Sequence, residues 1–140
     1  MKKTASAAWQ GGFKDGQGSI STQSGALKAY PYGVASRFED QPGTNPEELL
    51  GAAHAGCFTM ALSLILGEAG FTAEQMDTHA EVTLEKQGEG FAITKSHLIL
   101  RAKIPGIDAA KFAELTDQAK QGCPVSKVLN AEITLDAALA

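Results

Sequence analysis

The longest uninterrupted apolar segment predicts one long helix in the middle of the chain. Between Glu48 and Glu68 there is no acidic or basic residue apart from one histidine. Asn45 offers an N-cap oxygen with Glu48 at the third helical position, the arrangement of a capping box. Gly70 can adopt the left-handed conformation that ends a helix. These signals predict a helix over about 46–69.

A helix that is apolar on all sides belongs in a protein core or in a membrane. This segment approaches membrane-spanning length, but it contains Thr59, Ser63 and several glycines, and no Lys or Arg flanks it. A core helix wrapped by sheet is therefore the better interpretation. Gly51 and Gly56 each cost about 1 kcal/mol relative to alanine in a helix interior. Their presence is explicable if another backbone or a ligand approaches closely there.

Alternating segments before and after this helix predict strands. We expect them at 4–9, 19–22, 32–38, 79–86, 91–104 and 131–138. In the fifth, the apolar positions change from odd to even numbers near Lys95–His97, which predicts a β-bulge. The fold class is α+β, a mostly antiparallel sheet wrapped around a long buried central helix, in a single domain of residues 1–140.

A second, amphipathic helix is expected over about 109–121. Asp108 is its N-cap, and Gly122 ends it. Cys123 follows directly, before a short helical turn at 125–129. A side chain placed just after a helix end is often accessible, so we expect Cys123 to lie in a loop.

Composition and charge exclude several classes of function. The chain has 140 residues, is 44% hydrophobic and carries a net charge of −4 with a pI near 5.3. This balance argues against non-specific nucleic-acid binding and against binding to anionic membranes. The first residues lack the apolar region of a secretory signal, so we expect a cytoplasmic protein. The three histidines have no metal-ligand spacing with the cysteines, so no metal site is expected.

Two cysteines in a reducing compartment are either inert core residues or participants in redox or nucleophilic chemistry. Cys57 lies in the middle of the long helix, where the helix dipole gives little help, so an active thiolate there needs a neighbouring cation or base. One buried thiol and one loop thiol fit an attacking and a resolving cysteine. Packing as small hydrophobic side chains is the alternative for each.

Four polar residues are candidates to assist the thiol. His54 lies three residues before Cys57 and is either its base or a hydrogen-bonded structural histidine. Arg37 is either the cation that lowers the thiol pKa or a solvated strand arginine. Glu47 and Glu48 are favoured by the helix dipole, and either carboxylate could hold an arginine through two parallel hydrogen bonds.

Two motifs give the chain a specific resemblance. Residues 37–63 read RFED-x-x-GTNPEELLGAAHAGCFTMALS, and residues 122–129 read GCPVSKVL. Together with TASAAW near the start, PYG, GFAITK and the late AEITLD, they resemble the osmotically inducible protein C and organic hydroperoxide resistance (OsmC/Ohr) family. The resemblance covers essentially the whole chain, and His54 is typical of the OsmC-like branch.

The resemblance implies a thiol peroxidase without metal or organic cofactor. Cys57 would be the peroxidatic cysteine and Cys123 the resolving one, with Arg37 stabilising the thiolate and Glu47 orienting that arginine. It also implies an intertwined homodimer with active sites at the subunit interface. Arg37 could then act within its own chain or across the dimer.

The same resemblance implies stress defence against organic hydroperoxides and, more weakly, hydrogen peroxide. A dithiol reductant, with a lipoyl-type dithiol as the candidate, would restore the two thiols. Phe38, Phe58 and Met60 are the apolar residues expected to contact the substrate. Two rival functions stay open: a Cys–His hydrolase or acyl-transfer enzyme, and a non-catalytic stress protein that binds an apolar ligand.

Overall fold

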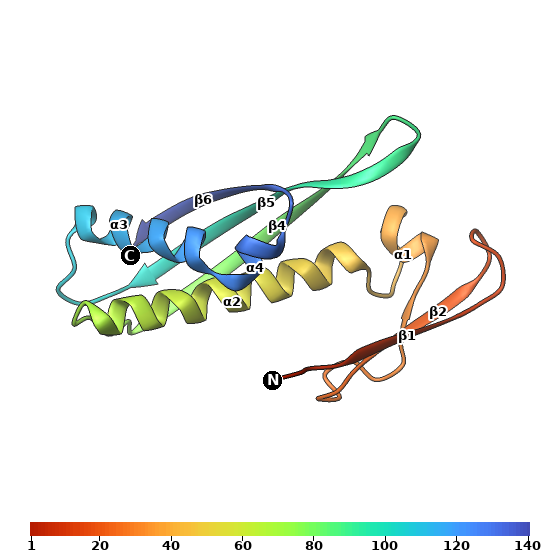
Figure 1. The fold of residues 1–140 in the computed structure, drawn as a ribbon, viewed down its shortest axis with the longest axis horizontal. Coiled ribbons are helices and arrows are strands. Elements are labelled where there is room, and N and C mark those ends of the chain that lie inside the picture. Colours follow the sequence, from red (N-terminus) through yellow and green to blue (C-terminus); the bar gives the residue numbers. More distant parts are fainter. The chain divides into compact units, whose positions relative to one another are not determined.

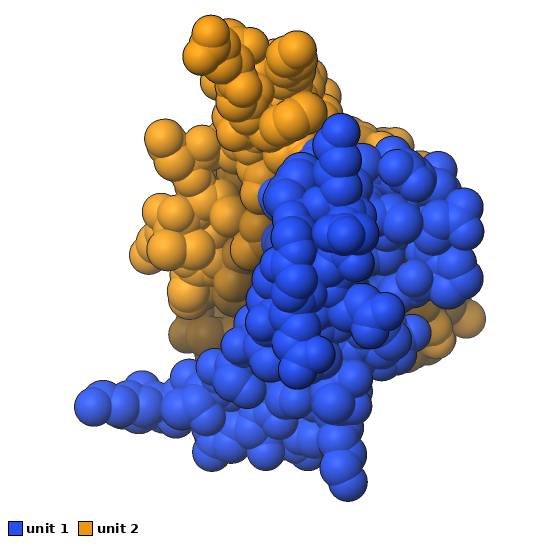
Figure 2. All heavy atoms as spheres, turned by 90° about the vertical axis from the view of Figure 1, so that its right-hand side faces the viewer, with its two compact units in different colours: residues 1–49 blue, residues 50–140 orange.

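The computed structural model describes residues 1–140. It divides into two compact units, residues 1–49 and residues 50–140 (Figure 2). In chain order the elements are β1 (Ala5–Gln10), β2 (Gln17–Thr22), β3 (Tyr30–Tyr32), α1 (Val34–Phe38), α2 (Pro46–Glu68), β4 (Gln75–Gln87), β5 (Gly90–Lys103), α3 (Ala109–Gly122), α4 (Pro124–Val128) and β6 (Glu132–Leu139) (Figure 1).

The first unit is an antiparallel three-stranded sheet in the order β1-β2-β3, followed by the short helix α1. Every residue of β1 is exposed. The buried residues of this unit are the polar Ser36, Thr44 and Glu47, and none of its residues belongs to the hydrophobic core. A small sheet needs a covered apolar face to be stable, and this one has no apolar core of its own.

The predicted strand at 32–38 is wrong. Strand β3 ends at Tyr32, and the following residues form α1. The Ser36 hydroxyl accepts a hydrogen bond from the Gly33 N–H at 3.0 Å and donates one to the Thr44 carbonyl at 2.8 Å. Local hydrogen bonds from a serine side chain stabilise a turn of helix as an alternative to sheet pairing. Arg37 therefore projects from a helix rather than from a strand.

The long helix α2 runs over Pro46–Glu68, which confirms the predicted range within one residue. The Asn45 side chain accepts a hydrogen bond from the Glu48 N–H at 2.8 Å, as expected for the N-cap. The predicted return bond of a capping box is replaced, because the Glu48 carboxylate accepts a hydrogen bond from the Thr44 hydroxyl at 2.8 Å. Gly70 ends the helix with a φ of 89°.

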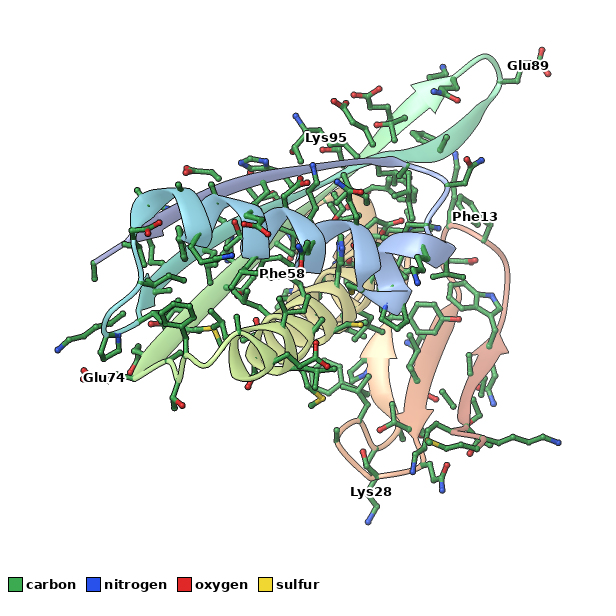
Figure 3. The ribbon with its side chains drawn as sticks, turned by 60° about the vertical axis from the view of Figure 1, so that its left-hand side comes forward. Phe13, Lys28, Phe58, Glu74, Glu89 and Lys95 are labelled. Carbon is green, nitrogen blue, oxygen red and sulfur yellow. The ribbon has the colours of Figure 1, made fainter.

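The second unit contains the hydrophobic core. Its sheet has the order β4-β5-β6, with β4 and β5 antiparallel and β5 and β6 parallel. Alternate β5 residues face α2 and α3, which cover the same side of the sheet (Figure 1). Phe58 lies between these two helices (Figure 3). The core comprises Phe58, Leu62, Leu66, Leu98, Leu100, Ala102, Ile104, Phe112, Leu115, Ala119 and Cys123.

The bulge predicted in the long strand is confirmed. Thr83 pairs with Lys95 and Leu84 pairs with Ile93, so Thr94 is the extra residue on β5. It lies just before the range in which the apolar phase changes. Asp108 caps α3 by accepting a hydrogen bond from the Lys111 N–H at 2.7 Å, also as predicted.

By length and composition α2 could cross a membrane. Its Phe58, Leu62 and Leu66 are packed in the protein core. Met60 and Leu64, on another side of the helix, are 75% and 65% exposed. The α+β class is as predicted, but within a single chain the helix is buried on one side and not all round.

Candidate active site

The two cysteines lie close together in the second unit. Cys57 lies on α2, and Cys123 lies between α3 and α4. The Cys123 side chain and the Val125 N–H are both near enough to the Cys57 sulfur to shift its pKa. Both cysteines are free thiols. The fold therefore brings together two sulfur atoms that are 66 positions apart in the sequence.

The exposure of the two thiols is the reverse of what the sequence suggests. Cys57 is half-buried, whereas Cys123 is fully buried in the hydrophobic core. The reason is the sharp junction between α3 and α4, where the Cys123 amide still bonds to the Ala119 carbonyl at 3.0 Å. This geometry keeps residue 123 attached to the inner side of α3 and not in an open loop.

The Cys57 thiol is not activated by the groups of its own unit. Burial raises the pKa of Cys57, and the hydrogen bond with Cys123 raises it further; the Val125 amide opposes them. None of the groups of residues 50–140 that act on this thiol is a cation. A reactive thiolate at this position would need a positive charge from outside the second unit.

His54 is buried and forms hydrogen bonds with two serines. Its Nδ1 lies 2.6 Å from the Ser96 hydroxyl on β5, and its Nε2 lies 2.7 Å from the Ser126 hydroxyl on α4. Burial lowers the pKa of His54, which favours the neutral ring. Since both ring nitrogens are occupied by serine hydroxyls, His54 has no free nitrogen for Cys57.

Arg37 and Glu47 form an ion pair in the first unit. The Arg37 Nη2 lies 2.6 Å from Glu47 Oε1, and the Arg37 Nε lies 3.1 and 3.2 Å from the two carboxylate oxygens. The Arg37 and Glu47 side chains are 34% and 11% exposed. The guanidinium carbon also lies 5.4 Å from the centre of the Phe38 ring, a cation–π contact. The Glu48 carboxylate accepts a hydrogen bond from the Thr44 hydroxyl instead, so Glu47 is the acid paired with the arginine.

An apolar pocket of about 250 Å³ lies beside this arginine within the first unit. It is lined by Trp9, Phe13, Tyr32, Gly33, Val34, Phe38 and Pro46 together with Arg37. Phe38 and Arg37 are the two lining residues that were site candidates from the sequence. The aromatic residues Trp9, Phe13 and Tyr32 were not among the predicted substrate contacts. Phe13 lies in the connection between β1 and β2 (Figure 3).

A glycine allows the two largest aromatic residues of this pocket to meet. Gly18 pairs with Trp9 on one side and with Tyr32 on the other, so the three residues form one row across the sheet. The two rings contact edge to face, with centroids 5.6 Å apart. A Cβ on Gly18 would overlap the Tyr32 ring and lie 2.7 Å from Trp9 Cε3. A glycine within a strand is the sequence signal for such a close approach.

The other two residues expected to contact the substrate lie elsewhere. Phe58 is fully buried in the core of the second unit, so its side chain has no surface to offer a ligand. Met60 is exposed and lines a shallow hollow with Thr59 and Met76. A Cβ added at Gly51 would make ordinary contacts with β4, 3.5 Å from the Ala80 carbonyl oxygen, and one added at Gly56 would meet no atom within 4 Å. The close approach expected at these two glycines is therefore not present within this chain. No group of three or more His, Cys, Asp or Glu side chains is arranged to hold a metal ion.

Comparisons with known proteins identify the family of this chain. The sequence pattern of the family described as OsmC-like protein matches residues 38–138. The chain is 58% identical over 136 residues to the peroxiredoxin OsmC of Escherichia coli (strain K12), covering 97% of this chain and 95% of that protein. It is 32% identical over 104 residues to the organic hydroperoxide resistance protein of Xanthomonas axonopodis pv. citri, covering 70% of this chain and 68% of that protein.

Solved structures share the fold. The organic hydroperoxide resistance protein OhrB of Bacillus subtilis superposes with a TM-score of 0.71 at 28% identity, covering 98% of each chain. An OsmC-like protein of Vibrio cholerae superposes with a TM-score of 0.79 at 15% identity over 99% of each chain, which bears on the fold alone. The chain therefore belongs to the OsmC-like protein family.

Proposed function

We propose that this chain is a thiol-dependent peroxidase in which Cys57 and Cys123 reduce organic hydroperoxides to alcohols. Its relatives include a peroxiredoxin and proteins named for organic hydroperoxide resistance. The observation that carries the assignment of roles is the difference in exposure between the two interacting thiols. Cys57 is the partly exposed member of the pair and meets the peroxide, and the buried Cys123 resolves the product.

The reaction runs in two steps. The Cys57 thiolate attacks the distal oxygen of the hydroperoxide, the O–O bond breaks, and the alkoxide leaves and is protonated to the alcohol. Cys57 is then a sulfenic acid. The Cys123 sulfur attacks the Cys57 sulfur, the S–O bond breaks, and the oxygen leaves as water with the thiol proton. A dithiol, for which a lipoyl-type compound is the candidate, reduces the disulfide by exchange.

Arg37 supplies the charge that Cys57 lacks within its own unit. Its guanidinium is held by Glu47 through three nitrogen–oxygen contacts of 2.6 to 3.2 Å. A bidentate carboxylate fixes the plane of an arginine and leaves its remaining N–H donors free to bind a second anion. In this proposal that anion is the Cys57 thiolate of the same chain or of a second copy.

The proposed active form of the protein is a homodimer. The first unit has no apolar core, and its Trp9, Phe13 and Tyr30 are exposed. The exposed Met60 and Leu64 of α2 form a second uncovered apolar surface. Exposed apolar groups in this number favour association with another chain. The proposal therefore includes an intertwined dimer in which residues 1–140 act as one OsmC-like domain, in the cytoplasm.

The apolar pocket beside Arg37 favours an organic hydroperoxide over hydrogen peroxide. Its lining is aromatic and aliphatic apart from the arginine, so it can bury the hydrocarbon group of the substrate while the guanidinium faces the peroxide. Hydrogen peroxide has no such group to bury. Similar rate constants for both substrates would remove this part of the proposal.

The Cys–His hydrolase is the weaker alternative. A histidine that activates a thiol must accept its proton, but both His54 nitrogens are engaged by serine hydroxyls. A cysteine hydrolase would also retain its activity without Cys123.

The test measures the consumption of cumene hydroperoxide and of hydrogen peroxide with dihydrolipoamide as reductant. We expect turnover by the wild type, none by Cys57→Ser, and about one equivalent followed by arrest for Cys123→Ser, because the sulfenic acid then has no resolving thiol. Ser63→Ala, on an exposed part of α2, serves as a control that keeps both thiols. Wild-type consumption no faster than that of a free thiol would end the peroxidase proposal.

A further inference from the structure

His54 joins three elements around the cysteine pair. It lies on α2, three residues before Cys57, and its ring bridges Ser96 of β5 and Ser126 of α4. His54 and Ser96 are 0% exposed, and Ser126 is 9% exposed. Residues three positions apart on a helix are neighbours on one side. The bridge therefore lies one helical turn from the reacting sulfur.

The bridge is made of neutral groups whose hydrogen bonds can all be satisfied. Neutral imidazole has one N–H donor and one acceptor nitrogen, and a serine hydroxyl can serve either of them. Burial lowers the pKa of His54, which keeps the ring in that neutral form. A buried group of this kind specifies one arrangement of the elements that it joins, because displacing any of them leaves a buried polar atom without a partner.

Helix α4 links the bridge to Cys123, the residue that the bridge would position. It has five residues, Pro124–Val128, and follows Cys123 directly. Val125 donates its N–H to the Cys57 sulfur, and Ser126 is the next residue. A five-residue helix has few hydrogen bonds of its own, so the Ser126–His54 bond is a principal tie between α4 and α2.

We propose that His54 is a positioning residue for disulfide formation: the Ser96–His54–Ser126 bridge holds α4 against α2, so that Cys123 stays within reach of the Cys57 sulfenic acid. The proposal rests on the two-cysteine peroxidase function above. Its effect falls mainly on the second step. There the Cys123 sulfur must approach the Cys57 sulfur in line with the breaking S–O bond. The first step does not use Cys123; it depends on the peroxide and on the Cys57 thiolate, for which Arg37 supplies the positive charge, and α4 contributes to it only through the Val125 N–H.

The experiment separates the two steps in single turnover. Reduced protein is mixed with one equivalent of cumene hydroperoxide, and samples quenched over time are analysed by mass spectrometry. Dimedone adducts report the sulfenic acid, and the loss of two hydrogens reports the disulfide. The variants are Ser126→Ala, which removes one end of the bridge and leaves the histidine ring in the core, and His54→Gln.

Thr116→Val is the matched control. Thr116 is also a buried hydroxyl residue, but its oxygen donates to carbonyls of its own helix, at 2.8 Å to Phe112 and 3.1 Å to Ala113. It does not tie α4 to α2. A general loss of core stability would affect this variant as well.

A displacement of about 1 Å in a reacting group can slow a step about 100-fold. We therefore expect sulfenic acid to form within about twofold of the wild-type rate in Ser126→Ala, and the disulfide to form at least about tenfold more slowly. The dimedone adduct should accumulate in that variant, and Thr116→Val should behave as wild type.

Two results would overturn the proposal. One is a wild-type rate of disulfide formation in folded Ser126→Ala. The other is an equal slowing of both steps, which would place His54 in the activation of Cys57. Absence of both sulfenic acid and disulfide in the wild type after mixing with the peroxide would instead refute the peroxidase function itself.

Discussion

Neutralising Glu47 tests whether the ion pair with Arg37 serves the reaction. Hydrogen bonds to a charged group contribute about 1.5–3 kcal/mol and neutral ones about 0.5–1.5 kcal/mol, so Glu47→Gln loses about 1 kcal/mol of the force that orients the guanidinium. The Arg37 side chain is 34% exposed, and solvent screening keeps the loss at this lower end. Glu47→Ala removes both acceptor oxygens and loses about 2 kcal/mol.

These energies translate into a graded loss of the first step. About 1 kcal/mol lowers the population of oriented arginine about fivefold, and about 2 kcal/mol lowers it about thirtyfold. The rate of sulfenic acid formation at pH 7 should fall by the same factors. The apparent pKa of the reacting thiol should rise, because the cation is less often beside it.

The assay is the single-turnover reaction with cumene hydroperoxide, measured from pH 5 to pH 9. Glu48→Gln is the matched control, since it removes the same charge one residue further on but is bonded to Thr44. It should react within about twofold of the wild type. A folded Glu47→Ala variant with the wild-type rate and pH profile would refute the reasoning, and so would equal losses in the Glu47 and Glu48 variants.

Three further predictions concern stability and the pocket. Gly18→Ala places a Cβ against Tyr32 and Trp9. We therefore expect about 1–3 kcal/mol of destabilisation in urea unfolding and weaker discrimination in favour of organic substrates. The control is Gly33→Ala, whose Cβ meets no atom nearer than 3.7 Å. Gly67 lies inside α2 with open space around its Cβ position, so Gly67→Ala should raise the free energy of unfolding by about 0.5–1 kcal/mol, and an unchanged value would contradict this. Because the folded-state pKa of His54 lies below its ordinary value of 6.5, the unfolded chain binds more protons as the pH falls, so stability is complete above about pH 6.5 and declines below it. His54→Gln should flatten this slope in urea titrations between pH 5 and pH 8, and an unchanged slope would assign it to other groups.

The long helix and the bulge could be predicted because their signals are local. Asn45 and Gly70 mark the ends of α2 through side-chain and backbone preferences that act over a few residues. The change of apolar phase in β5 follows from the twofold alternation of strand side chains. The strand predicted at 32–38 was wrong because the alternating pattern is also compatible with a short helix. The Ser36 hydroxyl stabilises that helix.

The parts that could not be predicted depend on contacts between distant residues. Nothing near Cys123 in the sequence indicates that its side chain turns into the core, because that depends on the angle between α3 and α4. The Trp9–Gly18–Tyr32 row likewise requires the register of three strands. The partners of His54 lie 42 and 72 positions away, so the sequence could offer only a choice between base and structural residue.

In the proposed mechanism, the difference in exposure between the two thiols determines which sulfur the reductant attacks. Once the disulfide has formed, an incoming dithiol meets the half-buried Cys57 sulfur, while the Cys123 sulfur stays enclosed in the core. The mixed disulfide with the reductant therefore forms on Cys57, and Cys123 is the leaving group of the exchange. Alkylating reagents should follow the same order and label Cys57 first in the reduced protein. In this mechanism a single sulfur, that of Cys57, therefore reacts with both the oxidant and the reductant.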